Sequence, residues 1–331
     1  MSKTNLCSVA DVSKMIADGR ILLLAGDEAL LSQLPPGRWI GGTSVNFISD
    51  EGGVTDDERI LVTDITEHAK KAEIRTYDLA TFKTIGANYP DNGFTVVIVP
   101  GLSDIHAAFA KDVQSYEGVF NAPLIGWISG VHLAEIGMRT PKCFAGTNEP
   151  LTAKAVAMHV SLADGFMAHL DIVNLFTQGE GEEIEFSTEG FSTEGECLIG
   201  GKPGNLAQYI AANGIDTKLP LVADFNDAMI NVSIQTVDVD GGEVQFYAPV
   251  FKGVKYRFAS PVKDYIGEFA RQAGEKEVGR VAFSCNCILN YEYADLEGKK
   301  TGTFVGPVTF GEIAYMLVNQ TLAYLAIDKA A

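Results

Sequence analysis

Basic residues and long apolar runs are both scarce in this chain. It has 25 Lys and Arg against 43 Asp and Glu in 331 residues, a formal net charge of -18. Proteins that bind nucleic acid or anionic membranes draw affinity from clustered positive charge, so we exclude both as partners. The most apolar windows, such as Phe94–Pro100, are far shorter than the ~20 residues that span a bilayer. The first residues also lack the apolar core of a signal peptide.

Cysteines, histidines and catalytic signatures are also few. Five cysteines, an odd number, do not form a disulfide framework, and reduced thiols are typical of the cytoplasm. We therefore expect a soluble cytoplasmic protein. The chain has no phosphate-binding loop, no dinucleotide fingerprint and no hydrolase or zinc-protease motif. We predict no cofactor, no metal and no catalytic residue from these motifs.

Apolar residues make up 47% of the chain and charged residues 21%, which is typical of a globular protein. The alternating apolar residues of Val156–Leu162 predict a strand with one buried face. Asp238–Gly242 predicts a hairpin turn between two strands, and such hairpins disfavour a purely parallel sheet. The chain is therefore predicted to be an α+β protein, with two mixed α/β sandwich domains and largely antiparallel sheets.

A glutamate-rich segment from Thr177 to Gly204 suggests where the domains divide. It holds seven glutamates before the first basic residue, Lys202, and repeats Phe-Ser-Thr-Glu-Gly at residues 186–190 and 191–195. This composition predicts an exposed loop or hairpin, and the alternative of a calcium site lacks the spacing of an EF-hand. We predict an N-terminal domain over residues 1–198 and a C-terminal domain over residues 199–331.

Local signals predict several individual elements. Ser8 has the spacing of a helix cap, and Gly19 follows at the position of a left-handed C-cap. A short helix starting at Asn205 should end at Gly214, and an amphipathic helix should run from Ser260-Pro261 to Gly274. Single strands are predicted over residues 39–47 and 229–237. In the first of these, Gly41 and Gly42 would allow another group to approach the backbone closely.

Two thiols lie on one predicted strand, in Cys285-Asn286-Cys287. On a strand both would point to the same face. A zinc site would need two further ligands with suitable spacing, and none is present. One interpretation is a nucleophilic or redox thiol, which would require a base and an electropositive setting. The other is that these small residues line a pocket. His159, on a predicted strand, is interpreted as a neutral, packed imidazole rather than a general base.

Polar groups also accompany glycines near the C-terminus. Gly306–Ile313 contains Gly311, which permits close backbone approach, and Glu312, which can accept hydrogen bonds from an ammonium group. Asn319-Gln320-Thr321 adds donors and acceptors before the last predicted strand. The alternative is that Glu312 is an exposed turn residue and Asn319 caps a turn.

These segments together resemble the C-terminal domain of the FIST family. The resemblance is carried by Val281–Asn286, Gly306–Ile313 and Asn319–Thr321, in the order found in that family, and more loosely by Trp39–Ser44 for its N-terminal domain. The family has Gly-Arg after the cysteine and His before the asparagine. This chain has Cys287-Ile288 and Val318 instead, which puts the family's ligand in doubt.

The resemblance implies a sensory protein that binds a small polar metabolite, such as an amino acid, between its two domains. The length leaves no room for an output domain, so a signal would pass to a separate protein. One alternative is an enzyme that uses Cys285 or Cys287, and another is a self-assembling protein that forms homo-oligomers. The predicted ligand-binding residues are Gly41, Gly42, Thr43, Ser44, Cys285, Asn286, Glu312 and Asn319.

Overall fold

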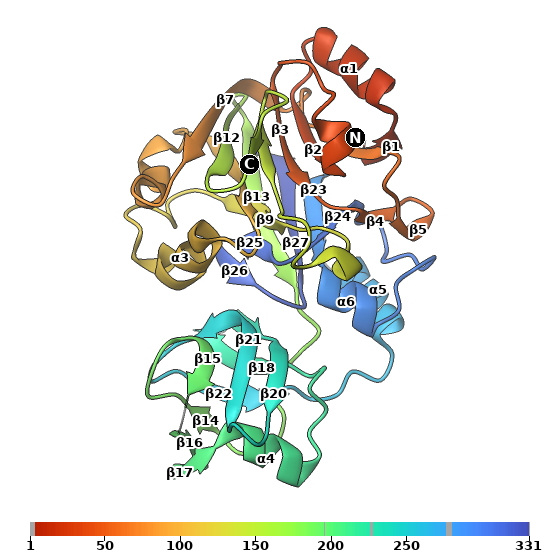
Figure 1. The fold of residues 1–331 in the computed structure, drawn as a ribbon. Coiled ribbons are helices and arrows are strands. Elements are labelled where there is room, and N and C mark those ends of the chain that lie inside the picture. The colour runs from red at the N-terminus through yellow and green to blue at the C-terminus, as the bar shows by residue number, and fades with distance from the viewer. Residues whose placement is uncertain (1–3, 195, 226–227, 276–279, 331) are drawn as a thin grey trace. The chain divides into compact units, whose positions relative to one another are not determined.

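The computed structural model describes residues 4–194, 196–225, 228–275 and 280–330, in two compact units (Figure 1). Unit 1 consists of Met1–Val173, Phe269–Leu317 and Leu322–Ala331, and unit 2 of Asn174–Glu268 and Val318–Thr321. Unit 2 is therefore inserted into unit 1. This differs from the predicted single boundary at residue 198, which falls inside a strand of unit 2.

Unit 1 contains three six-stranded sheets. The strand order of sheet 1 is β1 (Thr4–Cys7), β6 (Ile60–Asp64), β2 (Leu22–Gly26), β3 (Trp39–Thr43), β10 (Cys143–Ala145) and β11 (Pro150–Leu151). The order of sheet 2 is β7 (Ala69–Tyr77), β12 (Ala155–Leu162), β8 (Gly93–Pro100), β9 (Leu124–Ser129), β25 (Glu312–Ala314) and β26 (Met316–Val318). The order of sheet 3 is β13 (Phe166–Val173), β27 (Leu322–Lys329), β23 (Arg280–Cys287), β24 (Gly306–Thr309), β4 (Asn46–Ser49) and β5 (Gly52–Thr55).

The three sheets have the same topology, so unit 1 is built from three copies of one repeat. In each sheet the third and fourth strands are parallel, namely β2 with β3, β8 with β9 and β23 with β24. The neighbouring pairs whose register the structure describes are antiparallel. The repeats span residues 4–64, 69–162 and 166–329, and none of this regularity was predicted from the sequence.

Each repeat completes a sheet of another repeat. After its second parallel strand, each repeat forms a hairpin, and that hairpin extends a neighbouring sheet. The hairpin β4–β5 of repeat 1 joins sheet 3, β10–β11 of repeat 2 joins sheet 1, and β25–β26 of repeat 3 joins sheet 2. This cyclic exchange locks the three repeats together, because no sheet is complete within one repeat.

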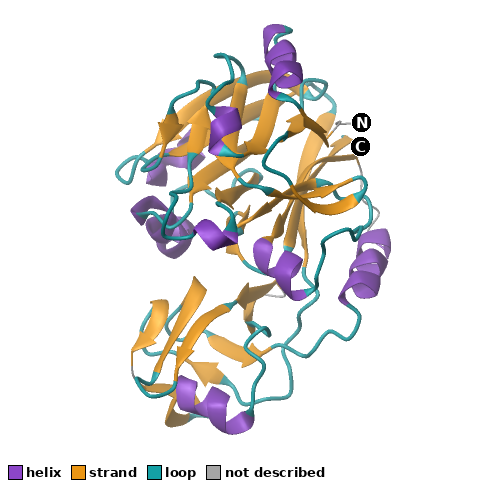
Figure 2. Cartoon of the chain, turned by 45° about the vertical axis from the view of Figure 1, so that its right-hand side comes forward, coloured by secondary structure: helices purple, strands orange, loops and turns teal. Residues whose placement is uncertain are grey.

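Helices follow the strands of each repeat and are short (Figure 2). Those of unit 1 are α1 (Val9–Ala17), α2 (Glu28–Leu31), α3 (Asp104–Asp112), α6 (Ile288–Tyr293) and the 3-10 helices at Phe82–Asn88, Val113–Ser115 and Leu133–Glu135. Helix α5 (Tyr265–Glu275) contains the point where the chain returns from unit 2 to unit 1. No helix in the described ranges is long and apolar enough to cross a membrane.

The inner faces of the three sheets share one apolar core. It includes Ile40 of sheet 1, Trp127 of sheet 2 and Phe283 of sheet 3, and the rings of Trp127 and Phe283 stack with centroids 5.4 Å apart. Helices α1 and α2 cover the outer face of sheet 1, where Val12 and Leu31 pack on Trp39. Burial of this apolar surface is the main stabilising contribution that the three-sheet arrangement makes.

The described part of unit 2 has two sheets and the helix α4 (Leu206–Asn213), and it also contains the first residues of α5. One sheet has the order β17 (Lys202–Asn205), β16 (Glu196–Ile199), β14 (Ile184–Glu185), β22 (Lys255–Phe258), β18 (Leu221–Phe225) and β19 (Ala228–Val232). The other has the order β15 (Gly190–Glu194), β21 (Glu243–Val250) and β20 (Ile234–Asp238). Unit 2 has its own apolar core, with Phe186, Phe246 and Tyr256 in edge-to-face contact.

The α+β class and the largely antiparallel sheets are confirmed. Ser8 caps α1, Gly214 ends α4 in the left-handed conformation, and β20 and β21 form the predicted hairpin. The glutamate-rich segment contributes strands to unit 2, and its last two, β16 and β17, form a hairpin. Gly195, within its second repeat, lies outside the described residues.

Three predicted elements were wrong in extent. Residues 39–47 form β3 and β4, which belong to different sheets, and residues 229–237 likewise contribute to β19 and β20. Helix α5 starts at Tyr265 and not near Ser260. The carboxylate of Asp264 accepts a hydrogen bond from the Gly267 N–H (2.9 Å), so this aspartate supplies the N-terminal cap.

Candidate functional site

Seven of the eight predicted ligand-binding residues lie in unit 1, and Asn319 lies in unit 2. Gly41–Ser44 were expected on one side of a domain interface, and Cys285, Asn286 and Glu312 on the other. All seven residues belong to unit 1. All eight residues are buried. Their surroundings separate them into an interior group, a group at the end of β3, two asparagines, and Gly41, which pairs with Leu24 and Phe144 inside sheet 1.

Gly42, Cys285 and Glu312 gather around Trp127 in the core of unit 1. Glu312 lies opposite Trp127 in the β25–β9 pair, and the Cys285 thiol donates a hydrogen bond to the carbonyl oxygen of Gly126 (3.2 Å). A Cβ atom at Gly42 would lie 2.8 Å from the indole nitrogen of Trp127 and 2.6 Å from Ile98. The group that approaches the Gly42 backbone is therefore the protein's own core and not a ligand.

The thiol of Cys285 has no activating environment. Burial raises its pKa well above the ordinary value, and the nearby Glu312 and Cys287 raise it further. A nucleophilic or metal-binding cysteine needs a lowered pKa, because the thiolate is the reactive form. These surroundings instead keep the thiol protonated, and Cys287 is also fully buried.

The two predicted asparagines make hydrogen bonds of their own. Asn286 follows Cys285 on β23, and successive strand residues point to opposite faces. The side-chain oxygen of Asn286 accepts hydrogen bonds from the Cys287 N–H and from Asn290 of α6 (2.8 and 2.9 Å). In unit 2, the carbonyl oxygen of Asn319 accepts a hydrogen bond from Asn231 (3.0 Å). The seven predicted residues of unit 1 therefore do not share one set of contacts.

Thr43 and Ser44 lie at the carboxyl end of β3, next to a group of charged side chains. The Ser44 hydroxyl donates to the carbonyl oxygen of Val308 (2.7 Å). Thr43 exchanges backbone contacts with Lys142: its N–H donates to the Lys142 carbonyl, and its hydroxyl accepts from the Lys142 N–H (both 2.9 Å). Thr43 is thus the predicted residue that leads to a site accessible to solvent.

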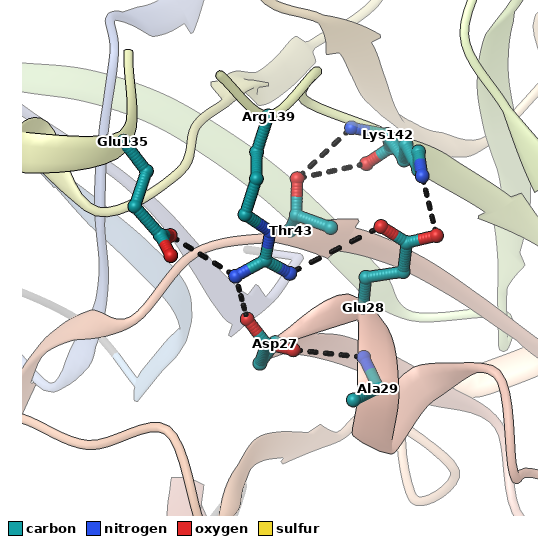
Figure 3. A network of polar contacts seen from close by, with 7 residues as sticks. All are labelled: Asp27, Glu28, Ala29, Thr43, Glu135, Arg139 and Lys142. Carbon is teal, nitrogen blue, oxygen red and sulfur yellow. Dashed lines mark hydrogen bonds and ion pairs between the residues drawn. The ribbon is translucent and has the colours of Figure 1, made fainter.

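We define the charged cluster as the side chains of Asp27, Glu28, Glu135, Arg139 and Lys142 (Figure 3). The Arg139 guanidinium lies 2.8 Å from a carboxylate oxygen of Asp27, 3.0 Å from Glu135 and 4.0 Å from Glu28. The Lys142 ammonium contacts the other carboxylate oxygen of Glu28. Three carboxylates face two cations, which leaves one net negative charge in the cluster.

The topology explains why these side chains meet. Strands β2 and β3 are parallel, so their carboxyl ends lie at one edge of sheet 1. Asp27 follows β2 and caps α2, accepting a hydrogen bond from the Ala29 N–H (2.8 Å). The cations come from the connection between β9 and β10. The carboxyl ends of parallel strands are the usual ligand-binding position in open α/β sheets.

Partial burial strengthens the interactions of the cluster. The side chains of Asp27, Glu28 and Arg139 are 12%, 29% and 34% exposed, so water screens their charges only in part. The hydrogen bond to Asp27 raises the pKa of Arg139 further above its ordinary value, and Glu135 adds to this effect against the opposing effect of burial. Arg139 therefore stays charged and is able to exchange one ionic partner for another.

The sequence analysis missed all five members of the charged cluster, although signals for four of them exist. Asp27 and Glu28 come directly after a buried strand, which is a typical position for a binding residue in an α/β unit. Arg139 and Lys142 are the only basic residues between Lys111 and Lys154. A pair of cations isolated in an acidic chain is a feature that could have been noticed.

His159 lies inside sheet 2 and not between domains. Its two ring nitrogens lie 2.8 Å from the hydroxyls of Tyr77 and Thr95. Burial lowers its pKa to about 4, and Arg75 adds to the effect. The neutral, packed imidazole that we predicted is consistent with these contacts. No group of three His, Cys, Asp or Glu side chains among the described residues is arranged to hold a metal ion.

Two open pockets of unit 1 lie away from the predicted residues. A pocket of about 460 Å³ is lined by β1, by the turn between β4 and β5 and by Arg59. Another of about 660 Å³ is lined by loop residues that include Lys83 and Tyr116. Neither pocket is lined by a residue of the group of charged side chains next to Thr43.

Comparison with protein families identifies one match that covers both units. The chain belongs to a family described as a family of unknown function (DUF6976), whose model matches residues 7–328. A search for relatives among curated proteins finds no match.

Proposed function

We propose that this chain is a cytoplasmic sensory protein that binds a small zwitterionic metabolite, such as an amino acid, at the charged cluster. The observation that carries the proposal is the pairing of two partly buried carboxylates with two cations at the carboxyl ends of β2 and β3. Such a site matches both charges of an amino acid. The motifs that resemble the FIST family support the same class of ligand.

Each charge of the ligand has a counterpart. Asp27 and Glu28 accept hydrogen bonds from an ammonium group, and the net negative charge of the cluster favours the entry of one further cation. The planar guanidinium of Arg139 suits two parallel hydrogen bonds to a carboxylate. The Arg139–Glu28 pair, at 4.0 Å, is the weakest contact of the cluster and the natural place for the ligand to enter.

This proposal differs from our expectation of a ligand between two domains. The residues expected on the two sides, Gly41–Ser44 on one and Cys285, Asn286 and Glu312 on the other, all lie within unit 1. We therefore propose that the ligand binds at the edge of sheet 1, where the charged cluster lies. No observation favours the alternative of a reactive thiol, since Cys285 and Cys287 are buried. We also propose that the chain passes its signal to a separate protein and that it forms homo-oligomers. Light scattering of the purified chain measures its oligomeric state.

Isothermal titration calorimetry with the common amino acids tests the proposal. We expect at least one to bind, and its carboxamide and N-acetyl derivatives, which each lack one charge, to bind much more weakly. Arg139→Gln and Asp27→Asn should each weaken binding about tenfold or more, because each removes a charge-assisted hydrogen bond. Arg20→Gln is the matched control, since Arg20 pairs with the single carboxylate Asp64 (2.8 Å).

Two results would contradict the proposal. One is the absence of binding by every amino acid at millimolar concentration. The other is binding that Arg139→Gln and Arg20→Gln leave equally unchanged, because the ligand would then lie elsewhere. A thermal-shift measurement gives an independent check, since a ligand that binds only the folded state raises the unfolding temperature.

A further inference from the structure

The three repeats of unit 1 differ sharply at one connection. In each repeat, a connection links the second parallel strand to the hairpin that joins another sheet. It is two residues long between β3 and β4 and again between β24 and β25, at positions 44–45 and 310–311. Between β9 and β10 it is thirteen residues long, at positions 130–142. Long loops in compact domains are usually functional, so this departure from the repeat needs a physical reason.

Both ends of the 130–142 loop are attached to the same residue. The Gly130 N–H donates a hydrogen bond to the carbonyl oxygen of Thr43 (2.8 Å). At the other end, the Thr43 N–H donates to the carbonyl oxygen of Lys142, and the Thr43 hydroxyl accepts from the Lys142 N–H. A loop of this length whose ends lie close together is an Ω-loop. Its middle can move while its ends stay in place.

The middle of the loop is held by charges more than by apolar burial. Leu133, Ile136 and Met138 are exposed, and Met138 is 76% exposed. Arg139, in contrast, reaches Asp27 and Glu28 across the end of sheet 1. Segments with few buried apolar contacts open at low free-energy cost. The Arg139–Asp27 ion pair therefore tethers the middle of the loop to the end of sheet 1.

The other two repeats lack the partners for such a tether. The first residue after the first parallel strand is Asp27 in repeat 1, whereas it is Gly101 in repeat 2 and Ile288 in repeat 3. The next residues are Glu28, Leu102 and Leu289. The long loop and the carboxylates that it contacts therefore occur together, at one of three equivalent positions. Repeat 1 differs from the others in its carboxylates after β2, and repeat 2 differs in its long loop after β9. The Arg139–Asp27 ion pair joins these two differences.

We infer that the 130–142 loop is a lid over the carboxyl ends of β2 and β3, with the Arg139–Asp27 ion pair as its latch. The inference rests on the proposed function for the ligand that operates the latch. An amino acid would pair its carboxylate with Arg139 and its ammonium with Asp27, so it replaces the latch with its own charges. The lid then opens to admit the ligand and closes on it, because the bound ligand restores the same ionic contacts.

Hydrogen exchange of the full chain, followed by mass spectrometry, tests the lid directly. We expect amides in residues 131–141 to exchange faster than those of β2, β3 and β9. Arg139→Gln should accelerate exchange in this loop about fivefold or more, since it removes the tether. Arg20→Gln should leave the loop unchanged, and Arg139→Lys, which keeps the charge, should restore part of the protection. Equal exchange in the loop of Arg139→Gln and wild type would overturn the lid.

Adding an amino acid separates the lid from the proposed function. The probe is each common amino acid at millimolar concentration, with binding measured by calorimetry in parallel. Binding that slows exchange in residues 131–141 supports both. Binding without any change in the loop overturns the lid and leaves the proposed function standing. If no amino acid binds but Arg139→Gln still accelerates loop exchange, the latch stands and the assigned ligand class is wrong.

Discussion

Thr43 and Lys142, 99 positions apart in the sequence, are joined by one backbone hydrogen bond, from the Thr43 N–H to the Lys142 carbonyl oxygen, and by a hydrogen bond from the Lys142 N–H to the Thr43 hydroxyl. The first residue ends β3 in repeat 1, and the second precedes β10 in repeat 2. Their contact closes the 130–142 loop and brings the Lys142 ammonium to Glu28. The charged cluster therefore depends on the way in which repeat 2 completes sheet 1.

Thr43→Val removes the hydroxyl from this contact while keeping the shape of the side chain. We expect the free energy of unfolding to fall by about 1–3 kcal/mol, because the buried Lys142 N–H loses its acceptor. Thr43→Ser, which keeps the hydroxyl, is the control and should lose much less. Urea denaturation of both variants measures the difference. Equal stability of the valine and serine variants would show that the hydroxyl contributes nothing.

Gly42→Ala should destabilise the fold, whereas Gly41→Ala should not. A methyl group at Gly42 would meet Ile98 at 2.6 Å and Trp127 at 2.8 Å, and overpacking of a dense core costs about 1–3 kcal/mol. At Gly41 the nearest atoms lie at 3.4 Å or more, an ordinary contact distance. Thermal denaturation of the two variants decides between a packing requirement and a ligand approach. Equal loss in both would contradict the packing explanation.

The free energy of unfolding should fall as the pH is lowered, because His159 is protonated more easily in the unfolded chain. Its folded pKa of about 4 lies below the ordinary value of 6.5, so the unfolded chain binds this proton more tightly. The stabilisation is therefore complete above pH 6.5 and is lost as the pH falls towards 4, by about 1.4 kcal/mol per pH unit in that window. Urea denaturation at several pH values measures the slope. His159→Gln should reduce the slope in this window but not abolish it, because burial also lowers the pKa of His106 to about 4. Parallel curves for variant and wild type would refute the assignment.

The cysteines should react slowly in the native protein. Cys143, Cys197, Cys285 and Cys287 are buried, whereas Cys7 is partly exposed. Burial raises the pKa of Cys285, which keeps the thiolate form rare. Labelling with a thiol reagent, followed by peptide mass spectrometry, should modify Cys7 first and the other four only on unfolding. Rapid labelling of Cys285 or Cys287 would revive the alternative of a thiol enzyme.

Much of the local structure was predictable, because it depends on neighbouring residues. The cap at Ser8, the left-handed Gly214 and the turn at Asp238–Gly242 each involve contacts within a few positions of the chain. The division of residues 39–47 into two strands was not predictable in this way. The chain turns at Ser44, whose hydroxyl bonds to Val308 of a different repeat. An alternating or apolar pattern predicts a strand but says nothing about which sheet the strand joins.

The candidate site shows the same limit. The sequence motifs selected Thr43, which lies beside the charged cluster, but they also selected Gly42 and Cys285, whose neighbours are core residues. In a sequence, the glycines and small polar residues of a binding loop cannot be distinguished from those of a crowded core. Asp27 and Arg139 are common surface types, and their significance comes from the 2.8 Å contact between them.

By itself, the sequence determined the α+β class, the caps and turns, and the acidic charge balance, because these depend on composition and on short-range periodicity. Only the tertiary structure decided that unit 1 consists of three repeats, that unit 2 is inserted into the third, and that each hairpin completes another repeat's sheet. The reason is physical: strands of similar pattern can pair in many ways, and the shared core selects one of them. The charged cluster is a consequence of that selection.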